Sequence, residues 1–85
     1  MNAALQVYSR DFDADFFKLP TDTQLRIQSA IDRLGRNLDI HAHHRMKGLE
    51  AYRLRVGDYR VIYTFDLSKG VLHVLAVGHR REVYR

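Results

Sequence analysis

Two stretches of alternating apolar and basic residues, Tyr52–Val56 and Tyr59–Tyr63, flank the dipeptide Gly57-Asp58. A two-residue loop that begins with glycine is typical of a tight hairpin turn of the II′ type. Such a turn fixes the register of both strands, and the alternation then gives the hairpin two unlike faces. The predicted cross-strand pairs are Val56 with Tyr59, Arg55 with Arg60, Leu54 with Val61, Arg53 with Ile62 and Tyr52 with Tyr63.

The two predicted faces of this hairpin have different partners. The apolar face is expected to cover the helices and consists of Tyr52, Leu54, Val56, Tyr59, Val61, Tyr63 and, further along, Phe65. The opposite face carries Arg53, Arg55, Arg60 and Ile62. Like charges directly opposite each other destabilise a sheet by a few tenths of a kcal/mol or more, so their clustering needs a reason. Because a guanidinium grips phosphate with two parallel hydrogen bonds, this face predicts a phosphate site. The alternative is an edge strand protected from aggregation by long cations.

The first half of the chain predicts a strand and a helical hairpin. Residues 4–8 are expected to form a strand with Leu5 and Val7 on one face, and Ser9 is expected to cap the first helix. The apolar stripe of that helix is predicted to be Phe12, Phe16 and Leu19, widened by Phe17. Pro20 should stop this helix, and Thr21 or Asp22 should cap the second. The stripe of the second helix is predicted to be Ile27, Ala30, Ile31, Leu34 and Leu38.

The remaining segments complete the predicted fold. Residues 39–49 are expected to form an irregular link with a turn at Gly48, and residues 66–70 a second turn. Residues 71–77 are apolar on both faces apart from His73, which is typical of an interior strand, and the N-terminal strand is its natural neighbour. The prediction is one α+β domain spanning residues 1–85, of order β-α-α-β-β-β, with a helical hairpin packed on one face of a four-stranded, mainly antiparallel sheet.

Charge and composition narrow the functional classes. Residues 1–40 hold five Lys/Arg and six Asp/Glu, whereas residues 41–85 hold nine Lys/Arg and four Asp/Glu, a change from −1 to +5. A basic half of this kind indicates an anionic partner, nucleic acid first and an acidic protein second. The absence of cysteine excludes a disulfide framework and thiol chemistry. We expect no membrane span and no signal peptide, and a cytosolic location.

Several polar residues have competing interpretations. His41, His43 and His44 suggest a zinc site, but they lack cysteine or paired carboxylate neighbours, and adjacent His43 and His44 should diverge. A solvated link that contacts RNA is the preferred interpretation, so no metal is predicted. His73 is expected in or beside the interior strand. Asp58 and Asp66 are expected to be turn residues, and Glu82 to form a salt bridge with a neighbouring arginine.

Three motifs carry a resemblance to a known family. They are the stretch 52–63, the stretch Val-Gly-His-Arg-Arg-Glu-Val-Tyr-Arg at 77–85 and Met-Lys-Gly-Leu at 46–49. Together they resemble the RelE branch of the RelE/ParE toxin superfamily, over nearly the whole chain. The resemblance implies a RelE-like fold and the toxin of a type II toxin–antitoxin system. It further implies a ribosome-dependent mRNA endonuclease in which the ribose 2′-hydroxyl attacks the adjacent phosphate in the ribosomal A site, without metal or cofactor.

The resemblance also implies roles for individual residues. Arg53 and Arg55 match the first basic pair, and Arg60 matches the phosphate-gripping arginine. Arg80, with Arg81 as the adjacent alternative, matches the residue that assists the leaving group, and Tyr84 matches the tyrosine that stacks on the substrate nucleotide. The predicted RNA-binding residues are Arg53, Arg55, Arg60, Arg80, Arg81, Arg85 and Lys47.

The sequence departs from the family at the general base. Some members carry lysine at the first basic pair, whereas arginine keeps its proton and is a poor proton acceptor. His79 is the candidate base, because imidazole accepts protons near neutral pH, and the alternative is that it only binds backbone or water.

The resemblance implies partners and leaves two alternatives. The expected partners are a RelB-like antitoxin with an acidic toxin-binding segment and the ribosome with mRNA in its A site. DNA is expected to be contacted only indirectly, through the antitoxin. The expected location is a prokaryotic cytoplasm, away from membranes. The antitoxin should cover the arginine face or displace a C-terminal element. The alternatives are a ParE-like DNA gyrase inhibitor of the same fold and a family member that binds antitoxin without cutting RNA. The full cationic set with a terminal tyrosine favours the RNA-cutting branch.

Overall fold

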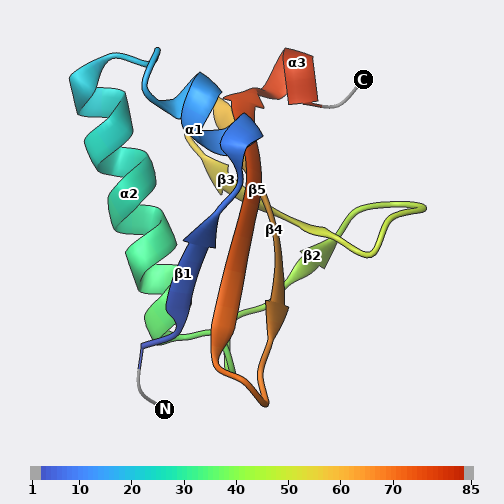
Figure 1. The fold of residues 1–85 in the computed structure, drawn as a ribbon. Coiled ribbons are helices and arrows are strands. Elements are labelled where there is room, and N and C mark those ends of the chain that lie inside the picture. The colour runs from blue at the N-terminus through green and yellow to red at the C-terminus, as the bar shows by residue number, and fades with distance from the viewer. Residues whose placement is uncertain (1–2, 84–85) are drawn as a thin grey trace.

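The protein folds as a helical layer on a curved sheet (Figure 1). The structure, a computed structural model, describes the backbone of residues 3–83 and the side chains of residues 3–81. Its elements are β1 (Leu5–Tyr8), α1 (Arg10–Phe16), α2 (Thr21–Arg36), β2 (His44–Arg45), β3 (Tyr52–Val56), β4 (Tyr59–Asp66), β5 (Val71–His79) and α3 (Arg80–Val83). None of the helices in this described part is long and apolar enough to span a membrane.

The strands form one mixed sheet in the order β1-β5-β4-β3-β2. β1 runs parallel to β5, and the other neighbours are antiparallel. The predicted α+β class, the element order and the interior position of β5 are confirmed. The sheet has one strand more than predicted, because residues 44–45 of the expected irregular link pair with β3. The short helix α3 was not predicted either.

The β3–β4 hairpin has the predicted register at every pair, from Val56 opposite Tyr59 to Tyr52 opposite Tyr63. Gly57 has a φ of 60°, and no non-glycine residue in the described part of the chain has a positive φ. A II′ turn needs a positive φ at its first central residue alone, whereas a I′ turn needs one at both. The II′ turn therefore explains why glycine precedes aspartate here.

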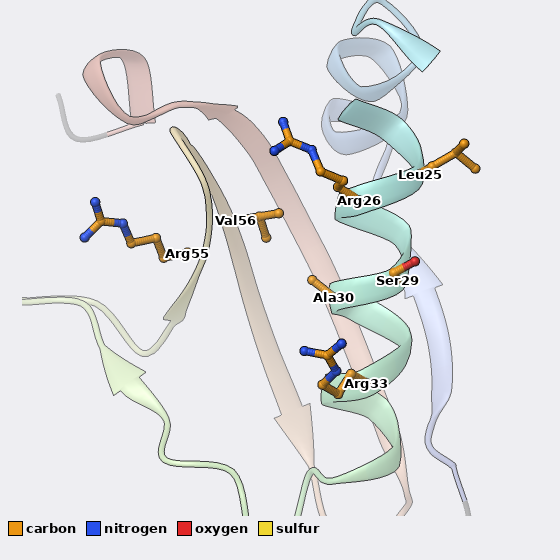
Figure 2. Close-up of a pocket in the computed structure, with 7 residues that line it drawn as sticks. All are labelled: Leu25, Arg26, Ser29, Ala30, Arg33, Arg55 and Val56. Atoms are coloured by element: carbon orange, nitrogen blue, oxygen red, sulfur yellow. The ribbon is translucent and has the colours of Figure 1, made fainter. Parts of the chain in front are cut away.

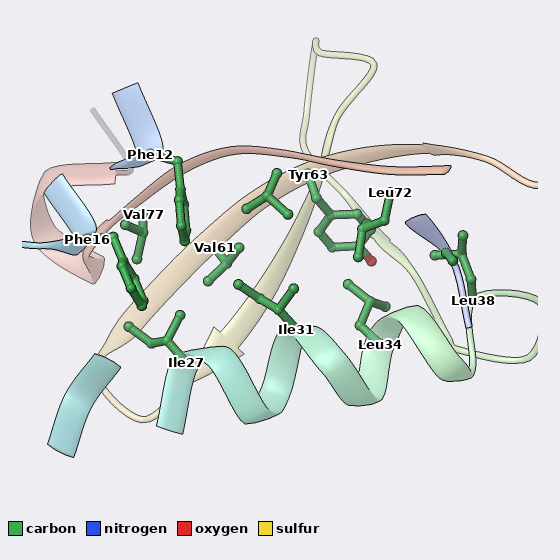
Figure 3. Close-up of a cluster of buried hydrophobic side chains, with 12 residues drawn as sticks. Phe12, Phe16, Ile27, Ile31, Leu34, Leu38, Val61, Tyr63, Leu72 and Val77 are labelled. Carbon is green, nitrogen blue, oxygen red and sulfur yellow. The ribbon is translucent and has the colours of Figure 1, made fainter. Parts of the chain in front are cut away.

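The core lies between α2 and the inner face of the sheet (Figure 3). Ile27, Ile31 and Leu34 recur at helical spacing, and all three point from α2 toward the strands. The buried strand residues that meet them are Val61, Tyr63, Leu72, Val74 and Val77. The rings of Phe12 and Phe16 stack with centroids 5.1 Å apart and close one end of this core. The predicted apolar face of the hairpin is thus the cover of the helices.

Details of α1 and α2 differ from the predictions. Ser9 does cap α1, since its hydroxyl accepts a hydrogen bond from the Phe12 amide at 3.0 Å. Phe17 is 69% exposed and does not widen the stripe, because α1 ends at Phe16. Pro20 is itself the N-cap of α2 and makes no side-chain capping bond, so the predicted cap at Thr21 or Asp22 was wrong.

The predicted apolar pair on β1 faces outward. Leu5 and Val7 are 65% and 43% exposed. Gln6, which lies between them, turns inward instead, and its amide donates to the Asp32 carboxylate on α2 at 2.8 Å. β1 is therefore held to the helix layer by polar contacts as well as by packing.

Candidate functional site

Three of the predicted arginines converge on the outer face of the sheet. Arg53 and Arg55 alternate with inward-facing residues of β3, and Arg60 stands opposite Arg55 on β4. Together with His44 they line a hollow of about 230 Å³. This arginine hollow thus brings three guanidinium groups and one imidazole together around one cavity.

The strand next to Arg60, β5, carries small residues on the outer face. Gly78 pairs with Arg60 and Ala76 pairs with Ile62, so little side-chain volume stands beside Arg60 on this face. Arg60 is only 9% exposed, whereas Arg55 is exposed. Arginine is rarely buried to this extent, and a fixed cation needs no reorganisation when an anion arrives. The site therefore combines one buried cation with more accessible ones.

The strand β2 brings a histidine to the hollow that the sequence did not assign to it. His44 pairs directly with Arg53, and residues opposite each other across two strands present their side chains on the same face. This strand shows no recognisable pattern in the sequence, because it is two residues long and lies in a link. The only indication in the sequence was the expectation that the side chains of His43 and His44 point in different directions.

His43 points the other way and is structural. Its Nδ1 lies 2.6 Å from the Tyr63 hydroxyl, its Nε2 lies 2.9 Å from the Leu38 carbonyl, and its ring stacks on Phe65 at 4.2 Å. A carbonyl only accepts, so Nε2 donates to Leu38 and Nδ1 accepts from Tyr63. Burial raises the pKa of the Tyr63 hydroxyl, which keeps its proton for this bond. The predicted solvated link is wrong at His43.

His43 is not available as a metal ligand. Both nitrogens of His43 are used within the fold, and no group of three metal-ligating side chains occurs in the described residues. His41 lies beside His43 with ring centroids 5.1 Å apart. Partial burial lowers the pKa of His41, and the nearby His43 and His44 lower it further.

His79 does not join the arginine hollow. It pairs with Tyr59, whose side chain is on the helix face, and the two rings meet edge to face at 5.8 Å. His79 lines a separate cavity of about 310 Å³ with Asp15 of α1 and with Lys18 and Leu19, which lie just after α1. The fold thus separates the predicted base from the predicted phosphate-binding arginines by the thickness of the sheet.

The C-terminal cations lie beside the hairpin turn. The amide of Arg80 donates to the Asp58 carbonyl at 2.9 Å, which ties the start of α3 to the β3–β4 turn. Arg80 and Arg81 are exposed and are not among the described residues that line the arginine hollow. Tyr84 and Arg85 lie outside the described residues, as does the side chain of Glu82 with its predicted salt bridge.

The other predicted polar residues are on the surface. Lys47 is exposed in the β2–β3 link, and His73 is exposed on the outer face of β5. Asp66 is a turn residue as predicted, and it accepts from the Ser68 hydroxyl at 2.7 Å and the Lys69 amide at 3.1 Å. The hydrogen bond from Ser68, with that from Lys69, lowers the pKa of the Asp66 carboxyl.

A second hollow of about 460 Å³ runs between α2 and β3 (Figure 2). Arg26 and Arg33 stand along α2, and Val56 points from β3 toward the helix while Arg55 points away from it. Leu25, 65% exposed, adds apolar surface. Because Arg55 lines both cavities, this α2–β3 groove adjoins the arginine hollow.

Comparison with known proteins identifies the class of this fold. Residues 7–84 match the model of a family described as ParE toxin of type II toxin-antitoxin system, parDE. That match spans most of the chain. The chain therefore belongs to the ParE toxin family of type II toxin–antitoxin systems. This family lies within the RelE/ParE superfamily, which is the superfamily that the motifs predicted.

Solved structures share the fold. The RelBE2 toxin–antitoxin complex from Mycobacterium tuberculosis contains a chain with a TM-score of 0.77, 23% identity and 94% coverage of both chains. The isolated Escherichia coli RelE toxin gives a TM-score of 0.77 at 22% identity, covering 96% of this chain and 92% of that one. The RelB–RelE complex from Methanococcus jannaschii gives 0.71 at 23% identity, covering 92% and 94%. No functionally curated protein matches the chain significantly in sequence.

Proposed function

We propose that this toxin cuts mRNA on the ribosome by attack of a ribose 2′-hydroxyl on the adjacent phosphate. The observation that carries the proposal is the convergence of Arg53, Arg55 and Arg60 on one hollow of the outer face. Their mutual repulsion costs stability, and a phosphodiester entering the hollow would offset it. A site of this kind needs no metal, because the charge that develops is held by guanidiniums.

The chemistry fits the arrangement of these cations. As the 2′-oxygen attacks, negative charge builds on the non-bridging phosphate oxygens, and fixed donors stabilise it best. The buried Arg60 is the grip on the phosphate, and Arg53 and Arg55 stabilise the growing charge. Arg80, with Arg81 as the alternative, assists the leaving oxygen, and Tyr84 stacks on the base. Lys47, Arg81 and Arg85 contact the RNA backbone.

The protein acts together with an antitoxin. RelE chains from Mycobacterium tuberculosis and Methanococcus jannaschii were solved in complex with RelB. In this protein the α2–β3 groove offers Arg26 and Arg33 beside the apolar Leu25, Ala30 and Val56. These features complement an acidic, amphipathic antitoxin segment. A segment bound there reaches Arg55, so it would block the arginine hollow while it is bound.

One observation favours a second function. The matching family model is named for ParE, and a ParE-like toxin would inhibit DNA gyrase by binding it. Such a toxin does not need a preformed phosphate site, so gyrase inhibition does not explain why Arg53, Arg55 and Arg60 line one hollow. We therefore rank gyrase inhibition second and RNA binding without cutting third.

The proposal is tested in a translation extract programmed with a defined mRNA. Addition of the purified toxin should produce new mRNA ends within codons at the A site, and Arg53→Gln should lower the cleavage rate by about 10²-fold. Arg36→Gln is the matched control, since Arg36 is an exposed arginine of α2 outside both hollows. Intact mRNA together with blocked DNA supercoiling would replace this proposal by gyrase inhibition. Intact mRNA with retained ribosome binding would favour the non-cutting alternative.

A further inference from the structure

The proposed reaction lacks a proton acceptor among the arginines. Attack by a 2′-hydroxyl requires that its proton be removed, and arginine keeps its own proton at any physiological pH. His79 has the right chemistry but lies on the helix face beside Tyr59. The base must therefore come from another residue on the outer face.

His44 is the titratable side chain that the fold adds to the arginine hollow. It lines the cavity with Arg53, Arg55 and Arg60, and it pairs directly with Arg53 across β2 and β3. The imidazole is exposed, so a bound ribose can reach it. Of the four side chains lining the hollow, only an imidazole holds an unprotonated nitrogen near neutral pH.

The neighbouring residue fixes the direction of His44. His43 is anchored by hydrogen bonds to Tyr63 and Leu38 and by stacking on Phe65. His43 directly precedes β2 and points inward, while the pairing of His44 with Arg53 places His44 on the outer face. A base whose backbone is held in position by an anchored neighbour loses little entropy when the substrate binds.

We propose that His44 is the general base of the RNA-cutting reaction, an inference that rests on the proposed function. His44 takes the proton of the 2′-hydroxyl while the 2′-oxygen forms a bond to phosphorus. The bond between phosphorus and the 5′-oxygen breaks, and that oxygen takes a proton from water. The products are a 2′,3′-cyclic phosphate and a 5′-hydroxyl end, and His44 then returns its proton to solvent.

The competing role for His44 is that of a further RNA-binding group. A binding group would lower affinity for the ribosome and mRNA when it is replaced, whereas a base lowers the rate of the chemical step. The test therefore measures single-turnover cleavage on ribosomes saturated with toxin, together with ribosome binding. The proteins are the wild type, His44→Gln and the control His73→Gln, which replaces an exposed histidine of the outer face on β5.

The expected result is a loss of about 10²–10⁴-fold in the single-turnover rate for His44→Gln, the usual contribution of a general base. Ribosome binding should be unchanged, and His73→Gln should cut at the wild-type rate. A His44→Ala variant should regain cleavage on addition of free imidazole, because the small base can enter the vacated space.

Each failure has a distinct reading. Wild-type cleavage by His44→Gln would overturn the role of His44 and leave the proposed function standing. A loss in His44→Gln with weakened binding, and no rescue of His44→Ala by imidazole, would also overturn it in favour of RNA binding. If the wild-type toxin cuts no mRNA, the proposed function itself fails, and the role of His44 fails with it.

Discussion

The two faces of the β3–β4 hairpin belong to the same strands but differ in their contribution to stability. On the inner face, Val61 and Tyr63 are fully buried against α2 and fill the core. On the outer face, Arg55 and Arg60 stand directly opposite each other. The inner pairs stabilise the fold through the apolar area they bury, whereas the outer pair opposes folding by repulsion.

This difference separates stability from activity within one hairpin. Residues of the inner face should change the free energy of unfolding when they are replaced, and residues of the arginine hollow should change the rate of RNA cleavage. The two histidines of residues 43–44 divide in the same way, since His43 is bonded into the core and His44 lines the hollow.

The largest expected effect is on the free energy of unfolding, at a residue that packs against the inner face. Ile31 is fully buried on α2, and Ile31→Ala should lower the free energy of unfolding by about 2–5 kcal/mol, measured by urea denaturation. Leu25→Ala on the exposed side of the same helix is the control and should stay within about 0.5 kcal/mol. Equal losses at both positions would mean that α2 does not cover the sheet through the Ile27–Leu34 stripe.

A comparable effect on activity is expected on the outer side. Arg60→Gln should lower mRNA cleavage by about 10²–10³-fold, because it removes the buried guanidinium that we propose binds the phosphate. Arg60→Lys should recover part of the rate, since it keeps the charge but loses the bidentate grip. Circular dichroism controls for folding. Full activity of folded Arg60→Gln would remove the arginine hollow from the mechanism.

The next effect is on stability and concerns the hydrogen bond between His43 and Tyr63. His43→Phe keeps the stacking on Phe65 but leaves the buried Tyr63 hydroxyl without its partner, at a cost of about 1–3 kcal/mol. The double variant with Tyr63→Phe should lose less than the sum of the two single changes, because the orphaned hydroxyl is gone. Additive losses in thermal or urea unfolding would show that the two side chains are not coupled.

The smallest expected effect is on stability, at the N-cap of α1. Ser9→Ala removes the acceptor for the Phe12 amide and should destabilise the fold by about 1 kcal/mol. A Ser29→Ala change in the middle of α2 provides the comparison, and it should be neutral or slightly stabilising because alanine favours a helix interior. A loss no greater than that of Ser29→Ala would exclude a capping role for Ser9.

The sequence predicted most where the interactions are local. The Gly57-Asp58 turn determined five cross-strand pairs, and helical spacing identified Ile27, Ile31 and Leu34 as core residues. The position of Arg53, Arg55 and Arg60 on one face followed from these two facts. By contrast, β2 is too short to show any periodicity, so the place of His44 beside Arg53 depended on a non-local pairing.

The side of the sheet on which His79 lies was not predictable for a different reason. Between Ile62 and Tyr63 the pairing with β5 shifts by one residue, from Ala76 to Val74. A shift of this kind moves every following side chain to the opposite face. β5 is apolar on both faces over most of its length, so its sequence has no alternation from which the shift could be read. His79 therefore faces α1 and not the arginines.

The most direct test of the separation between the two faces is Arg55→Gln, measured for both unfolding and cleavage. Arg55 is exposed and repels Arg60, so its replacement should leave the free energy of unfolding unchanged or raise it by a few tenths of a kcal/mol. The same protein should cut mRNA on the ribosome about 10²-fold more slowly than the wild type. Unchanged cleavage, or a loss of stability that accounts for the slower cutting, would contradict the assignment of the outer face to catalysis.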